Sequence, residues 1–328
     1  MNILIKILIV ALLLVAIYFQ VFARENAFDL WLTFKSRFTT AHLPYLLIVI
    51  LLVPINWGFE TYKFRTLIRD FSDLNFWQTY RSILAGITVS LFTPNRIGEV
   101  GGRVLLVKPE NNWKAVVATM VGSLSQLIVL LSVGFLGAIY FVFNFVQADF
   151  KGVEWMLAGG VILVGILIYG FFNLKKLIPL AQKLPYYNWF KKRFKDLKVL
   201  LHYNHQQLFI ALLFSLFRYL TYSFQYFLML HFFGIEVPFA AAISGIATIF
   251  LLQTSIPLPP VVGLLARGEI ALGVWGIFSA LSLNILAASF SLFVINLTLP
   301  ALIGAFFITK INVLKSLGYG KENKSSSK

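Results

Sequence analysis

Two short segments of this chain combine residue types that can bind an anion. The first contains Thr93, Pro94, Arg96, Gly98, Glu99 and Arg103, and the second contains Pro257, Gly263, Arg267 and Glu269. Arginine matches the geometry of a phosphate or carboxylate, and a nearby glutamate can orient it or bind a cationic group or a proton. These residues are therefore the predicted substrate-binding residues.

The order of residues in the first segment suggests how an anion would be bound. Pro94 interrupts a helix because it lacks an N–H group, and Thr93 can cap the helix that restarts after it. The free N–H groups at that helix start would face an anion. Arg96 adds a bidentate donor, and Glu99 lies within one helical turn of both Arg96 and Arg103.

Other interpretations of these charged residues stay open. Ionisable residues inside a membrane are costly and are usually functional, but in a wet loop they would need no function. A buried Arg–Glu pair that only holds the structure together is a second alternative. Arg218 lies within a long apolar stretch, where it can pair with Glu99 or Glu269, bind a lipid phosphate, or extend towards the membrane surface. We expect Glu60 to lie at the membrane interface.

The composition of the chain indicates a membrane protein. Hydrophobic residues make up 59% of the 328 residues and charged residues 12%, whereas soluble domains average about 45–50% and about 25%. The 16% aromatic content excludes a disordered chain. The absence of cysteine excludes disulfides and thiolate sites. The predicted fold class is all-α, a polytopic helical membrane protein.

Six uninterrupted apolar stretches are long enough to cross a bilayer, which takes about 20 residues. They are Ile3–Ala23, Leu43–Phe59, Lys114–Val146, Val153–Phe172, Gln207–Phe233 and Ile277–Ile308. Two further stretches, Ser82–Leu106 and Phe239–Trp275, contain the polar segments, and we expect them to form re-entrant or broken hairpins. The first stretch has no signal-peptide cleavage motif before Arg24, so we expect a retained helix.

The distribution of basic residues predicts the orientation in the membrane. The net charge is +15. Residues 174–206 hold eight basic residues against one acidic, and residues 309–328 hold five against one. Short loops rich in Lys and Arg stay in the cytoplasm, so we expect these segments, residues 61–81 and both termini to be cytoplasmic. The first hairpin would then enter from the cytoplasm and the second from the opposite side.

The spacing of the stretches indicates an internal repeat. The stretches that begin at Leu43 and Gln207 start 51 residues before Pro94 and 50 residues before Pro257. The prediction is one integral membrane domain over 1–310, with inverted halves at about 1–146 and 153–310, a basic cytoplasmic segment at 174–206 and a tail at 311–328. Inverted repeats with broken helices are typical of transporters, which bind substrate where the breaks meet. Coincidental spacing in a leucine-rich chain is the alternative.

The motif at 93–103 reads Thr-Pro-x-Arg-x-Gly-Glu-x-x-x-Arg, and a Pro- and Gly-bearing segment with Arg and Glu follows at 257–269. With these motifs the chain resembles, over nearly its whole length, the flippase-like membrane domain of lysylphosphatidylglycerol synthases. The chain departs from the usual family pattern at Asn95, where members have Gly, and at Val261 and Val262, within a segment that usually reads Pro-Gly-Gly-x-Gly. The resemblance implies a multi-pass protein of a bacterial inner membrane that handles lipid. It does not imply aminoacylation, because we expect no soluble catalytic domain in the short segment after the last stretch.

The predicted function is that of a flippase or transporter for an anionic phospholipid or a lipid-linked head group, without enzymatic activity. One alternative is a membrane-embedded glycosyl- or phosphoryl-transferase, which would need a base or metal-binding carboxylates, and the chain has no Asp-x-Asp motif. Another is a non-transporting accessory subunit of a lipid enzyme. No cofactor or metal is predicted, because His202 and His205 lack further ligands nearby and no phosphate-binding nucleotide motif is present.

The predicted partners are a phospholipid or lipid-linked substrate and a homo-oligomer or lipid-enzyme partner, but no nucleic acid. Residues 186–201 place aromatic and lysine side chains on opposite faces of a predicted amphipathic helix, so we expect this helix to bind anionic lipids of the inner leaflet. An ordinary positive anchor on the cytoplasmic side is the simpler interpretation.

Overall fold

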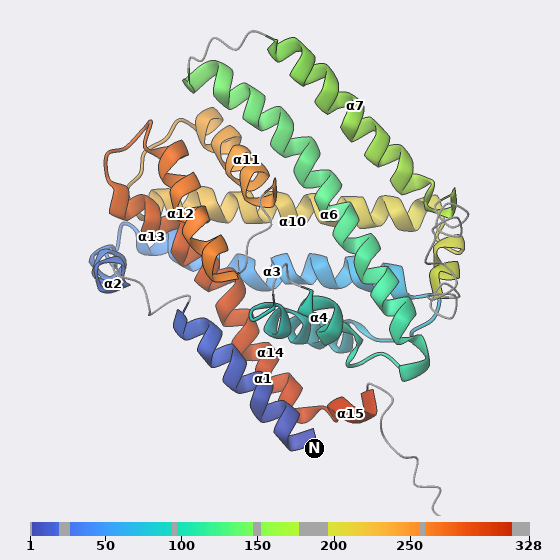
Figure 1. The fold of residues 1–328 in the computed structure, drawn as a ribbon. Helices are drawn as coiled ribbons and strands as arrows, with labels where there is room; N and C mark the ends of the chain where they lie inside the picture. Colours follow the sequence, from blue (N-terminus) through green and yellow to red (C-terminus); the bar gives the residue numbers. More distant parts are fainter. Residues whose placement is uncertain are drawn as a thin grey trace, which may run out of the picture.

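The computed structural model describes residues 2–19, 27–93, 97–146, 152–176, 196–255 and 260–316, and all regular elements within these ranges are helices (Figure 1). Five of the described helical segments are long and apolar enough to cross a membrane. They are Leu43–Ile68, Pro109–Val146, Trp155–Phe172, His205–Phe232 and Ser282–Lys310. The all-helical, polytopic membrane fold is thereby confirmed.

The first half of the chain contains the elements up to residue 146. They are α1 (Asn2–Ile17), α2 (Ala27–Ser36), α3 (Leu43–Ile68), α4 (Phe76–Ser90), α5 (Gly98–Val104), the 3₁₀ turn η3 (Pro109–Asn111), α6 (Asn112–Phe141) and the π-helical turn η4 (Val142–Val146). The sequence did not predict α2 or the extension of α3 past Phe59.

The second half begins with α7 (Val153–Phe172), the 3₁₀ turns η5 (Leu174–Lys176) and η6 (Asp196–Leu201), and α10 (His205–Phe232). It continues with α11 (Phe239–Ser255), α12 (Pro260–Trp275), α13 (Ser282–Phe293), the π-helical turn η7 (Val294–Thr298), α14 (Leu299–Lys310) and α15 (Val313–Ser316). Only residues 196–201 of the predicted amphipathic segment 186–201 lie in the described part.

The helices α3 and α10 lie side by side through the middle of the molecule (Figure 1). Asn204 and Gln207 form a capping box that starts α10. The side chain of Gln207 also donates to Asp70, just beyond the end of α3. These bonds fix the position of one long helix relative to the other.

Each predicted broken stretch forms two helices that pack on each other. The first pair is α4 and α5, and the second is α11 and α12. In the first pair a Cβ added to Gly102 would lie 2.4 Å from the Cα of Gly86, so only glycine permits this separation of the backbones. The glycine-rich motif therefore brings the two arms of the first hairpin together.

Each hairpin packs on a long helix from the other half of the chain. The first hairpin packs through α4 on α14, while the second packs through α11 on α6. A Cβ added to Gly304 in α14 would lie 2.1 Å from the Leu84 carbonyl oxygen, and one added to Gly137 in α6 would lie 2.4 Å from the Ala247 side chain. This reciprocal contact is the one that two symmetry-related halves would make. The inverted orientation of the halves stays a prediction.

Two ends of the molecule can be recognised from contacts between distant segments. At one end Lys6 donates to the Thr309 carbonyl, and the Asn112 side chain donates to the Ser316 carbonyl. At the other end the Asn284 side chain donates to the Phe233 carbonyl. The described terminal segments of the chain thus lie together at one end. The side of the membrane that this end faces stays a prediction.

Candidate anion-binding site

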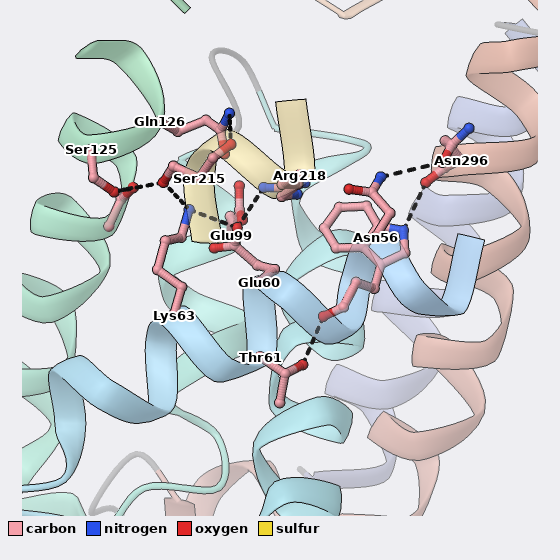
Figure 2. Close-up of polar contacts among 12 residues, drawn as sticks. Asn56, Glu60, Thr61, Lys63, Glu99, Ser125, Gln126, Ser215, Arg218 and Asn296 are labelled. Atoms are coloured by element: carbon pink, nitrogen blue, oxygen red, sulfur yellow. Dashed lines mark hydrogen bonds and ion pairs between the residues drawn. The ribbon is translucent and has the colours of Figure 1, made fainter. Parts of the chain in front are cut away.

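The carboxylate of Glu60 lies at the centre of a buried cluster of charged side chains. The side chain is 2% exposed. Its Oε1 accepts a hydrogen bond from Arg103 Nη2 at 2.7 Å, and its Oε2 lies 2.8 Å from Lys63 Nζ and 2.5 Å from Arg218 Nη1. Figure 2 shows Lys63 and Arg218 on opposite sides of Glu60. Cations from α3, α5 and α10 therefore meet on one carboxylate.

Glu99 supplies the second negative charge of this cluster. Its Oε1 pairs with Arg103 Nη2, one helical turn later in α5. With both carboxylates ionised, Glu60 and Glu99 balance two of the three cations Lys63, Arg103 and Arg218. Charges removed from water are stable only when they are paired and hydrogen-bonded. Counted over the described residues, the cluster thus retains one positive charge that an anion can neutralise.

The buried position of Arg103 follows from the close packing of the first hairpin. Its side chain is 2% exposed, and Ser82 Oγ in α4 donates a 2.5 Å hydrogen bond to its backbone carbonyl. The guanidinium group also lies 5.3 Å from the centre of the Phe64 ring. The hairpin thus brings a cation from residue 103 to a carboxylate at residue 60.

A polar network extends from Lys63 towards α6. Lys63 Nζ donates to Ser215 Oγ at 3.4 Å, and that hydroxyl lies 2.9 Å from Ser125 Oγ. The side-chain amide of Gln126 donates to the Ser215 carbonyl at 3.3 Å (Figure 2). These bonds connect α3, α6 and α10 around the charged cluster.

A polar cavity of about 210 Å³ lies beside the cluster. Its polar lining residues include Asn56, Trp57, Gln126, Arg218, Tyr219, Tyr222, Gln253, Thr254, Arg267 and Asn296. Arg218 belongs to both the cluster and the cavity, and its side chain is 16% exposed. Three buried lining atoms, Asn56 Oδ1, Gln126 Oε1 and Arg218 Nε, have no hydrogen-bond partner within the described residues. Such atoms are available to a polar ligand or to water.

A break in regular helical bonding shapes one wall of the cavity. Asn296 lies in the π-helical turn η7, and Pro300 four residues later has no N–H group to donate to its carbonyl. That carbonyl instead accepts a 3.1 Å hydrogen bond from Trp57 Nε1. The Trp57 ring lies 4.4 Å from the Arg218 guanidinium carbon. The π turn thus helps to hold the arginine at the cavity.

The second hairpin contributes Arg267 to the cavity lining. Its guanidinium carbon lies 5.2 Å from the centre of the Phe293 ring, and the residue lines the cavity together with Gln253 and Thr254. Residues two apart point to opposite sides of a helix. Glu269 is accordingly exposed, on a different side of α12 from Arg267.

The family model described as the lysylphosphatidylglycerol synthase TM region matches residues 3–304. The chain belongs to this family. The suspected resemblance is thereby confirmed, and family membership supports a multi-pass membrane protein with a lipid-related function. No match was found among the curated proteins or among the solved structures.

Four of the predicted residues lie in or beside the cluster and cavity of this family member. They are Glu99, Arg103, Arg218 and Arg267. Thr93 Oγ1 accepts a 2.8 Å hydrogen bond from the N–H of Gly98, the first residue of α5. Gly263 lies in the first turn of α12, and Glu269 is exposed. Pro94, Arg96 and Pro257 lie outside the described residues.

The central residue of the cluster, Glu60, was not predicted from the sequence. Glu60 was expected at the membrane interface, but it is buried among three cations and is the partner of Arg218, in place of the predicted Glu99 or Glu269. Asn56, Glu60 and Lys63 recur at spacings of four and three residues, which places them on one face of α3. That polar face within an apolar helix was the available signal.

Proposed function

We propose that this membrane protein binds the phosphate of an anionic lipid head group in the cavity between Arg218 and Arg267 and moves the head group across the bilayer. The observation that carries the proposal is the presence of two arginines from two different helices, α10 and α12, on one polar cavity. Arginine binds phosphate through paired, charge-assisted hydrogen bonds. The acyl chains would remain in the lipid phase while the head group passes through the protein.

The charge of the neighbouring cluster supports an anionic ligand. Glu60 and Glu99 neutralise two of the three cations around them, and Arg267 adds a further positive charge at the cavity. A phosphate entering the cavity would therefore meet excess positive charge next to the largely buried side chain of Arg218. Electrostatic attraction is stronger beside buried groups than in bulk water. Membership of a lipid-related family agrees with such a ligand.

Binding of phosphatidylglycerol to the purified protein in nanodiscs tests the site. Replacing Arg267 with Gln removes one charged donor, and a hydrogen bond to a charged group contributes about 1.5–3 kcal/mol, so affinity should fall by about 10- to 100-fold. Arg267→Lys should retain part of the affinity because it keeps the charge. Arg65→Gln, an exposed arginine on α3, is the matched control. Equal affinity for Arg267→Gln and the control would refute the assignment.

Translocation is tested separately in proteoliposomes that carry fluorescent phosphatidylglycerol. The fraction of lipid accessible to a membrane-impermeant quencher should change with time for the unmodified protein and much more slowly for Arg267→Gln. Arg267-dependent binding without translocation would instead favour the accessory-subunit alternative.

A further inference from the structure

A second groove lies apart from the cavity, between α3, α4 and α14, and has a volume of about 480 Å³. Its walls are mostly apolar. Ile50 and Ile303 on its edges are 43% and 52% exposed, and Leu84 on α4 is buried. In a membrane protein, apolar surface of this kind faces lipid tails. The groove can therefore receive an acyl chain.

Two prolines line the groove. Pro54 lies inside α3, and Pro300 lies at the start of α14, and both line the space. A proline ring displaces the preceding turn of a helix and so separates a helix from its neighbour. On the other side, Gly304 holds α14 against the Leu84 carbonyl of α4. The groove is thus bounded on this side by a close contact between the backbones of α14 and α4.

Positive charge gathers at one end of this groove. The exposed Arg81 lies with its guanidinium carbon 5.4 Å from the centre of the Phe307 ring, which lines the groove. On the same last turn of α14, Lys310 Nζ lies 4.2 Å from the centre of the Phe306 ring, and Lys6 donates to the Thr309 carbonyl. Three cations therefore surround one helix end next to an apolar groove. Such an arrangement matches the phosphate and acyl chain of one anionic lipid.

We propose that this groove binds an anionic phospholipid of the surrounding leaflet, with its phosphate on Arg81 and one acyl chain between α3, α4 and α14. The lipid would reinforce the contact of the first hairpin with α14, and thus with the other half of the protein. Trp77, which is 67% exposed and lines the groove, would lie next to the bound chain. The proposal does not depend on the central cavity.

The position of Trp77 permits a test that reports on this groove alone. The protein is placed in nanodiscs with phosphatidylglycerol or phosphatidylethanolamine that carries a brominated acyl chain, which quenches nearby tryptophan. The contribution of Trp77 is the difference in quenching between the unmodified protein and Trp77→Phe. Quenching of Trp77 should be about five times stronger with brominated phosphatidylglycerol than with brominated phosphatidylethanolamine. This is the ratio expected when one cation contributes about 1 kcal/mol to binding an anionic lipid.

Arg81→Gln should abolish the preference between the two lipids, and Arg81→Lys should keep most of it. Arg65→Gln, also at an exposed position, should leave it unchanged. Ile303→Trp should fill the groove and weaken quenching by both lipids, whereas Leu302→Trp on the same helix, outside the groove, should not. Because these two variants add a tryptophan, each is compared with its own Trp77→Phe version. Equal quenching by the two lipids in the unmodified protein, or an unchanged preference in Arg81→Gln, would overturn the proposal.

Discussion

Replacing Glu60 with Gln should destabilise the protein strongly, because this change removes the carboxylate that three cations share. In the native cluster Lys63, Arg103 and Arg218 are balanced by Glu60 and Glu99, and the substitution raises the net charge from +1 to +2. Breaking a buried ion pair by removing one partner costs about 3–5 kcal/mol. We expect the free energy of unfolding to fall by about that amount.

The loss can be measured by equilibrium unfolding in mixed detergent micelles, followed by tryptophan fluorescence. The double variant Glu60→Gln/Lys63→Met restores the net charge of the cluster to +1. The double variant should therefore lose less free energy of unfolding than the sum of the losses in the two single variants. The reasoning fails if Glu60→Gln unfolds like the unmodified protein, or if the two substitutions are additive.

Two further substitutions and one pH titration test the packing of the helices. Gly304→Ala should lower the free energy of unfolding by about 1–3 kcal/mol, because its Cβ would overlap the Leu84 carbonyl, and the same micelle unfolding assay measures this. Trp57→Phe should lose about 1 kcal/mol, because the Asn296 carbonyl loses its donor, and it should also weaken phosphatidylglycerol binding in nanodiscs. Burial and the charge of Asp70 raise the pKa of Tyr203, so its hydroxyl should remain protonated above pH 10 in an ultraviolet titration, in contrast to exposed tyrosines.

The arrangement of helices could largely be predicted from the sequence, because each break in hydropathy has a local cause. Proline and glycine mark the two hairpins, and long apolar stretches mark the crossing helices. The exchange of partners, in which α4 packs on α14 and α11 on α6, was not predictable in detail. It depends on small residues such as Gly304 and Gly137 facing a distant helix, and their spacing within one helix does not identify that partner.

Only part of the charged cluster could be predicted from the sequence. Arg103 and Glu99 were recognised because they lie in one motif, and Arg218 was recognised because it interrupts an apolar stretch. Glu60 was misplaced because it follows an apolar run, a position typical of a membrane interface. Its partners Arg103 and Arg218 lie 43 and 158 residues away, so only the folded chain brings them together.

The cluster also limits which part of the protein can move during the proposed transport. Arg103, Glu60 and Arg218 tie α5, α3 and α10 together, and separating them would leave buried charges unpaired at a cost of several kcal/mol. By contrast, α12 of the second hairpin packs chiefly on α11 and α13 rather than on α10. We infer that α12 moves relative to α10 when an anionic lipid binds, while α5 does not.

Spin labels can measure this difference, because the chain has no native cysteine. Ile97 at the start of α5, Leu220 on α10 and Leu265 on α12 are all more than half exposed and can carry labels. Adding phosphatidylglycerol should shift or broaden the distance distribution between 220 and 265, while the distribution between 97 and 220 stays narrow and unchanged. A lipid-dependent shift of the 97–220 distance alone, or an equal shift of both distances, would show that the charged cluster does not hold the first hairpin in place.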